Sequence, residues 1–177
     1  MPSSHQPRLI VFRGLPGTGK TTISRALAKK LGAFCLRIDT IEQAAKAAGV
    51  EKIGPAGYGI ANALAEDNLK LGFSVIADWV NPIAASRQAW RDLAVRSSVL
   101  LAEICLLCSD KAEHLRRVEE RQPDIPGHLL PDWEAVIQHE FESWDDGQQL
   151  VLDTADLSVA ELVSRSEAYV LGRDDQG

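Results

Sequence analysis

The chain has few cysteines, no long apolar run and no excess of positive charge, and each shortage excludes a class of protein. Three cysteines among 177 residues form an odd number, which fits a reducing compartment better than a disulfide framework. No apolar run approaches the roughly 20 residues that cross a membrane, and the polar segment Met1–Pro7 lacks the apolar centre of a signal peptide. A net charge of −6 argues against a broad surface for nucleic acid. We therefore expect a cytoplasmic protein without a membrane or nucleic-acid partner, while oligomeric state leaves no mark on the sequence.

Signatures of metal and nucleophile chemistry are also scarce. The four histidines are scattered, and no zinc signature or serine–histidine–aspartate spacing is present. Cys105 and Cys108 have the spacing of a redox pair, but they lie in the apolar run Val99–Cys108, which predicts a strand. Residues three apart on a strand point to opposite faces, so we expect both thiols to fill the core.

The most informative motif is a phosphate-binding loop. Residues Gly14–Thr21 spell GxxxxGK[ST] directly after the apolar segment Leu9–Phe12. A strand delivers such a loop, and its glycines let backbone N–H groups point at one anion. The helix that opens at Lys20 adds its positive dipole end, while Lys20 reaches the β- and γ-phosphates and Thr21 holds Mg²⁺. A chance glycine-rich turn is the alternative, and the strand–loop–helix context disfavours it. ATP and Mg²⁺ are the predicted cofactors. The predicted nucleotide-binding residues of the loop are Gly14, Leu15, Pro16, Gly17, Thr18, Gly19, Lys20, Thr21 and Thr22.

Five apolar segments alternate with helical patterns along the chain. Their near-continuous hydrophobicity is typical of strands covered on both faces of a parallel sheet. The order predicts an α/β fold, a three-layer αβα sandwich with a five-stranded parallel sheet and a helical lid. We expect a single domain over residues 1–177 with flexible tails at 1–7 and 172–177. The predicted strands are Leu9–Phe12, Phe34–Ile38, Phe73–Ala77, Val99–Leu107 and Gln149–Leu152. The predicted helices include Thr21–Leu31, Thr40–Ala48, Gly59–Leu71 and Asp132–Trp144, with capping boxes at Asp110–Glu113 and Ser158–Glu161.

A proline-rich interval separates two of the expected helices and suits a lid over about residues 117–132. Arg117 and Arg121 lie four apart before it, so they share a helix face and can project toward the phosphates. The alternative is a solvated helix face, because Glu113 and Glu120 are near enough to pair with them.

Ligands of α/β sheets bind where the strands end, and two aspartates lie at such positions. Asp39 follows the second predicted strand and is a candidate base for a substrate hydroxyl, although helix capping there is common. Asp78 ends the third, which matches the carboxylate that holds Mg²⁺ in phosphate-loop proteins, with a turn residue as the alternative.

Further residues near the strand ends are candidates for the rest of the site. Trp79, Asn81 and Arg87 follow the third strand and are predicted to line an acceptor pocket; a core-edge aromatic, a turn residue and a helix-surface residue are their ordinary alternatives. Thr154 and Ala155 follow the fifth strand, where their small size would let the backbone hold an adenine.

Together these residues resemble the small P-loop kinases, a superfamily with adenylate, shikimate, gluconate and adenylylsulfate kinases. The chain looks most like its bacterial "AAA family ATPase" branch, which is similar to chloramphenicol phosphotransferase and to the kinase half of polynucleotide kinase. The resemblance covers about Arg8 to Leu171. It implies that Asp39 activates the acceptor hydroxyl, with Arg117 near the adenine and Arg121 near the transferred phosphoryl group.

The predicted function is a Mg·ATP-dependent phosphotransferase acting on a hydroxyl of a small molecule, with Lys20, Asp39 and Arg121 as catalytic residues. Because only Arg37 and Arg87 stand out as acceptor-side arginines, a neutral or singly charged acceptor is favoured. Two alternatives stay open: a polynucleotide or RNA-end kinase, and a nucleotide-binding regulator with slow hydrolysis. A GTPase is disfavoured, since no Asn-Lys-x-Asp motif is present.

Overall fold

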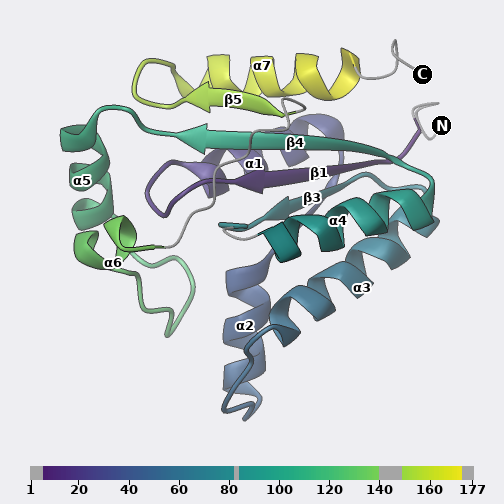
Figure 1. Ribbon diagram of the computed structural model, residues 1–177, viewed down its shortest axis with the longest axis horizontal. Coiled ribbons are helices and arrows are strands. Elements are labelled where there is room, and N and C mark those ends of the chain that lie inside the picture. Colours follow the sequence, from purple (N-terminus) through teal and green to yellow (C-terminus); the bar gives the residue numbers. More distant parts are fainter. Residues whose placement is uncertain (1–5, 82–83, 140–148, 173–177) are drawn as a thin grey trace.

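A computed structural model describes residues 6–81, 84–139 and 149–172 (Figure 1). Most of the two predicted tails, and residues 140–144 of the predicted helix at Asp132–Trp144, lie outside the described residues. The elements follow one another as β1 (Arg8–Arg13), α1 (Lys20–Leu31), β2 (Phe34–Arg37), α2 (Ile38–Ala47), α3 (Ala56–Lys70), β3 (Val75–Asp78), α4 (Ala84–Ser97), β4 (Leu100–Leu107), α5 (Lys111–Glu120), α6 (Trp133–Ile137), β5 (Leu150–Asp153) and α7 (Val159–Leu171).

The strands form one parallel sheet in the order β2-β3-β1-β4-β5, which confirms the predicted five-stranded sheet. β1 lies in the centre, with Leu9 opposite Val75 of β3 and Leu101 of β4. The segment that follows β1 therefore opens onto the middle of the carboxyl edge, where ligands of such sheets bind.

Helices cover both faces of the sheet, and β1 shows why its sequence is apolar throughout (Figure 1). Ile10 and Phe12 pack into a core with side chains of α1 and α7, whereas Leu9 and Val11 pack into a second core with α3 and α4. Alternate residues of a strand point to opposite faces, so a strand between two helical layers needs apolar residues at every position. The three-layer prediction is confirmed. α5 and α6 lie beyond the carboxyl ends of the strands (Figure 1).

Several predicted boundaries shift in the structure. β2 ends at Arg37 and α2 begins at Ile38, so Asp39 lies in the first turn of a helix rather than at a strand end. α6 covers only Trp133–Ile137, with Gln138 as its C-cap, so the long helix predicted there is wrong in its extent.

The two predicted capping boxes have different outcomes. Ser158 and Glu161 form the complete reciprocal box at the start of α7. Asp110 accepts hydrogen bonds from the N–H groups of Ala112 and Glu113, but the Glu113 carboxylate binds arginines instead of completing the box.

The prediction that both Cys105 and Cys108 fill the core is confirmed for Cys105 and wrong for Cys108, which lies beyond β4 and is partly exposed. All three cysteines are free thiols. Within the described part of the chain, no helix is both long enough and apolar enough to cross a bilayer.

Candidate active site at the carboxyl edge of the sheet

The segment after β1 is folded tightly around one carbonyl group. Leu15 O accepts hydrogen bonds from Thr18 N–H at 3.3 Å, from Thr18 Oγ1 at 2.9 Å and from Lys20 Nζ at 2.8 Å. Gly14 has a φ of +143°, and a Cβ there would lie 2.2 Å from the carbonyl oxygen of Leu106. The glycine is required because only a residue without a side chain fits this approach.

Lys20 is buried in this loop, with 8% of its surface exposed. Burial lowers its pKa from 10.5 to about 8, although the carboxylates of Asp78 and Asp39 favour its charged form. The two carboxylates thus stabilise the charged form of Lys20 by less than burial destabilises it. A polyanion such as a triphosphate would supply the additional negative charge that the buried ammonium lacks.

Asp78 and Thr21 fit the coordination chemistry of Mg²⁺. Asp78 ends β3 and is 3% exposed, and no described residue donates a hydrogen bond to its Oδ2. Burial raises the pKa of this carboxyl, while Lys20 and a hydrogen bond with Thr21 oppose that rise. A buried carboxylate oxygen without a partner, beside a hydroxyl, suits a hard cation with oxygen ligands. No group of three or more His, Cys, Asp or Glu side chains able to hold a metal occurs within the described ranges. Mg²⁺ needs only one or two protein carboxylates when waters and phosphate oxygens supply its other ligands.

A cavity of about 720 Å³ adjoins the loop, and its wall contains most of the predicted site residues. Counted over the residues that the structure describes, its wall contains six Lys or Arg side chains against four Asp or Glu, although the whole chain carries a net charge of −6. This described part of the wall therefore favours anionic ligands locally. The predicted site residues in its wall are Pro16, Gly17, Gly19, Lys20, Thr21, Thr22, Asp39, Asp78, Trp79, Arg117 and Arg121.

Asp39 faces this cavity from the first turn of α2. Its Oδ2 lies 3.4 Å from Nε of Arg37 and 3.9 Å from Nε2 of His128 in the lid. Arg37, the N-cap residue of α2, makes no side-chain cap bond, and its φ and ψ are extended. Neither contact of Asp39 blocks its second carboxylate oxygen, so the group is placed to meet a ligand.

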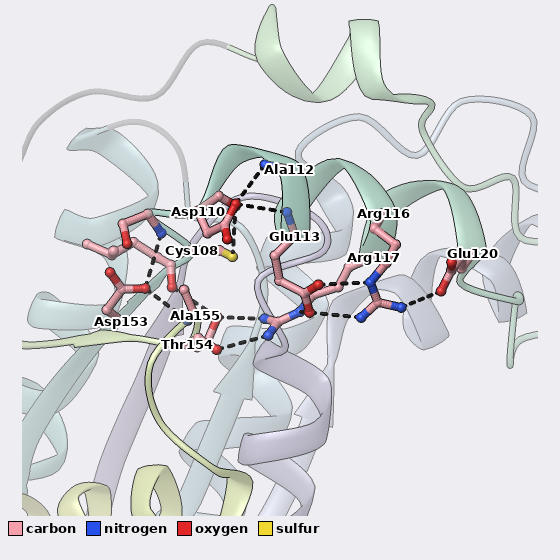
Figure 2. Close-up of polar contacts among 12 residues, drawn as sticks. Cys108, Asp110, Ala112, Glu113, Arg116, Arg117, Glu120, Asp153, Thr154 and Ala155 are labelled. Atoms are coloured by element: carbon pink, nitrogen blue, oxygen red, sulfur yellow. Dashed lines mark hydrogen bonds and ion pairs between the residues drawn. The ribbon is translucent and has the colours of Figure 1, made fainter.

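The two lid arginines have different environments. Nε of Arg117 donates to Glu113 at 2.7 Å, and its two terminal nitrogens donate to Oγ1 and O of Thr154, each at 2.9 Å (Figure 2). Arg121 donates to Pro131 O at 2.9 Å, but its buried Nε has no hydrogen-bond partner among the described residues, and burial lowers its pKa. Arg117 is thus a fixed part of the wall, whereas Arg121 retains an unused donor.

Besides Gly14, Leu15 and Thr18 of the loop, four predicted site residues lie outside the wall as far as the structure describes it. Asn81 is fully buried at a φ of +47°, where Nδ2 donates to Phe12 O at 2.8 Å and Oδ1 accepts from Trp90 Nε1 at 3.1 Å. Both ends of the amide help to hold β1 to α4, so the structure favours a structural role for Asn81 over the predicted one in substrate binding. Arg87, Thr154 and Ala155 also lie outside the wall; Thr154 acts through its bonds to Arg117.

His114 supports the loop in a way that the sequence did not indicate. Its Nε2 donates to Pro16 O at 2.8 Å, and its ring meets Trp133 of α6 edge to face at 5.2 Å. The two bonded residues are 98 positions apart, so no local pattern carries this signal. Arg25 and Asp124 are two further wall residues that sequence reasoning missed.

Comparisons with known proteins agree with this geometry. The sequence model of a family described as "AAA domain" matches residues 9–138. No curated protein matches the sequence significantly. Among solved structures, a gluconokinase from Sinorhizobium meliloti 1021 is similar, with 19% identity, a TM-score of 0.67, and coverage of 97% of this chain and 96% of that chain.

Two further structures share the fold and were solved with nucleotides. The APS kinase CysC of Mycobacterium tuberculosis, in complex with AMPPNP and APS, has 15% identity and a TM-score of 0.69 over 94% of this chain and 98% of that chain. Kti12 of Chaetomium thermophilum, in complex with ADP-AlF3, has 19% identity and a TM-score of 0.66 over 92% and 98%. These similarities establish a fold shared with P-loop kinases.

Proposed function

The chain belongs to the AAA domain family, and we propose that it is a Mg·ATP-dependent kinase that transfers the γ-phosphoryl group to a hydroxyl of a small molecule. The observation that carries the proposal is the shared cavity wall of Lys20, Asp39 and Asp78. It combines a phosphate cradle, a carboxylate able to act as a base and a carboxylate able to bind a metal. The similarity to structures named as gluconokinase and APS kinase supports the same assignment.

On the ATP side, the loop would bind the phosphates through its N–H groups and through Lys20. Arg121 would neutralise charge on the transferred group, because its unpartnered Nε gives it a donor to offer. Thr21 and Asp78 would hold Mg²⁺, which when bound supplies charge neutralisation at the phosphate oxygens. Arg117, fixed by Thr154, would lie beside the nucleoside part of ATP.

On the acceptor side, Asp39 would accept the hydroxyl proton while the phosphoryl group moves onto that oxygen. Arg37, 3.4 Å from its carboxylate, would hold Asp39 in position. Placing the acceptor between Asp39 and the phosphate loop turns a bimolecular step into one within a single complex, which is the main catalytic effect in phosphoryl transfer.

The test measures ADP formation with a panel of nucleosides, sugars, hydroxy acids and antibiotics. It compares wild type with Asp39→Asn and with Asp67→Asn, a matched change at an exposed position of α3. We expect one acceptor class to stimulate wild type and Asp67→Asn alike, and Asp39→Asn to lower transfer by about 10²–10⁴-fold while AMPPNP still binds.

Other outcomes have definite meanings. If Asp39→Asn transfers phosphate at the wild-type rate, Asp39 is not the base. Slow hydrolysis indifferent to every acceptor and to the substitution favours a nucleotide-binding regulator. Stimulation by a 5′-hydroxyl oligonucleotide alone, with strong salt dependence, favours a polynucleotide kinase.

A further inference from the structure

A carboxylate of the lid sits between two arginines of the cavity wall. Both oxygens of Asp124 accept from Nη1 of Arg37, at 2.7 and 2.8 Å, and Oδ2 also accepts from Nη1 of Arg25 at 2.9 Å. The three residues come from the irregular segment 121–132, the end of β2 and the middle of α1. Segments far apart in the chain therefore build one anion-binding arrangement.

The two sides of this contact differ in how firmly they are held. The Arg37 side chain is only 11% exposed, whereas Asp124 is 44% exposed on a segment without helix or strand. Burial alone would lower the pKa of Arg37, but its hydrogen bonds with Asp124 raise it. Leaving a mostly buried guanidinium without any anionic partner is costly, and the exposed carboxylate is the partner that another anion can replace.

The position of the arrangement connects it with the chemistry of the site. Arg37 Nε lies 3.4 Å from Asp39, and both arginines share the cavity wall with Lys20. Arg116 and Arg117 are already bound to Glu113. Arg37 and Arg25 are thus the wall cations that one exposed carboxylate of the segment 121–132 holds, next to the proposed base.

We propose that the phosphoryl acceptor carries an anionic group, a carboxylate or a phosphate-type oxyanion, that binds Arg37 and Arg25 in the place occupied by Asp124. The inference rests on the proposed kinase function and names its substrate class. Asp124 is then an internal competitor that keeps the arginines paired until the acceptor arrives, and its release frees the lid. The expectation of a neutral or singly charged acceptor is replaced by that of a charged one, because Arg25, which the sequence did not indicate, supplies a second cation.

The experiment separates this anion site from the phosphate loop. The protein is first saturated with Mg²⁺ and AMPPNP, which fills the loop, and sodium acetate or sodium sulfate is then titrated at constant ionic strength. Tryptophan fluorescence follows binding, since Trp79 lies in the cavity wall. Variants are Asp124→Asn, Arg37→Gln and Arg25→Gln, with Glu119→Gln as the control for an equal change of charge at an exposed position of α5 outside the described wall.

We expect saturable binding of at least one anion, and the tighter of the two identifies the class of group. Asp124→Asn should bind it about tenfold more tightly, the effect of removing one charge-assisted competitor. Arg37→Gln should weaken it at least tenfold, Arg25→Gln should weaken it as well, and Glu119→Gln should match wild type. The opposite changes expected for Asp124 and Arg37 distinguish competition from a simple structural latch.

The proposal is overturned if neither anion binds saturably to Asp124→Asn, or if that substitution weakens binding. If wild type does not bind AMPPNP at all, that result refutes the proposed function instead. In that case the same titrations on the nucleotide-free Lys20→Gln protein decide the anion site alone. If Arg37→Gln does not fold, Arg25→Gln and Asp124→Asn must still change affinity in opposite directions.

Discussion

The pKa of Lys20 predicts a specific pH dependence of nucleotide binding. Below pH 8 the lysine is charged in the free protein and in the complex, so affinity is constant. Above pH 8 the free protein has lost this proton, and binding of the phosphates must restore it at a cost of about 1.4 kcal/mol per pH unit. With a complex pKa above 10, the association constant for AMPPNP should fall about 25-fold between pH 7.5 and 9.5.

Calorimetry in buffers of different ionisation enthalpy tests this directly. Wild type should take up nearly one proton per nucleotide at pH 9.5 and almost none at pH 7. The Lys20→Arg variant is the matched control, because arginine stays charged over this range. It should bind AMPPNP more weakly, but its association constant should not begin to fall near pH 8. A wild-type affinity that stays flat to pH 9.5, or the same fall in Lys20→Arg, would refute the assignment of this proton to Lys20.

The same shift predicts a change in the stability of the nucleotide-free protein. The folded pKa is about 8 against 10.5 in the unfolded chain, so below pH 8 the buried charge costs about 3 kcal/mol. That cost decreases as the pH rises from 8 to 10.5. Urea unfolding should show wild type gaining about 2 kcal/mol relative to Lys20→Arg between pH 8 and 9.5. No relative gain would contradict the burial of a charged Lys20.

Three further predictions concern the supports of the site. Gly14→Ala should abolish AMPPNP binding and lower the melting temperature, since its Cβ would lie 2.2 Å from Leu106 O; unchanged binding would show that the loop can shift. Asn81→Ala should cost about 1–3 kcal/mol in urea unfolding because Trp90 loses a buried acceptor, and a neutral result would contradict this role. Arg117→Lys should weaken AMPPNP binding while leaving Lys20-dependent pH behaviour intact, because the single nitrogen of lysine cannot span the acceptors on Glu113 and Thr154 that three guanidinium nitrogens reach; wild-type affinity would exclude a role for these contacts.

The fold and the phosphate loop were predictable because their signals are local. Leu9–Phe12 is apolar at every position, which a strand between two helical layers requires, and the loop glycines follow at fixed spacing. The end of β2 was harder to predict from the sequence. Ile38 is buried and apolar, which suits the last residue of a strand and the first of a helix equally well.

The polar part of the site depended on contacts between distant residues. The sequence suggested that Asn81 could contact a substrate, but its amide nitrogen donates to the carbonyl oxygen of Phe12, 69 positions away. Arg25 and Asp124 are separated by 99 positions and meet only because the lid folds back over α1. Such pairings arise from tertiary geometry, so a single sequence offers the residue types without showing which of them are already engaged.

The packing of the phosphate loop against α5 makes the conformation of the loop depend on the residues of that helix. Gly17 has a φ of +86°, and a Cβ there would lie 2.6 Å from Val118 and 3.2 Å from His114. The middle of the motif is therefore constrained by a helix a hundred positions later as well as by the phosphates. Exchanges of the lid between relatives should succeed only when α5 is transferred with it. A graft that ignores this dependence would distort the loop before any substrate enters.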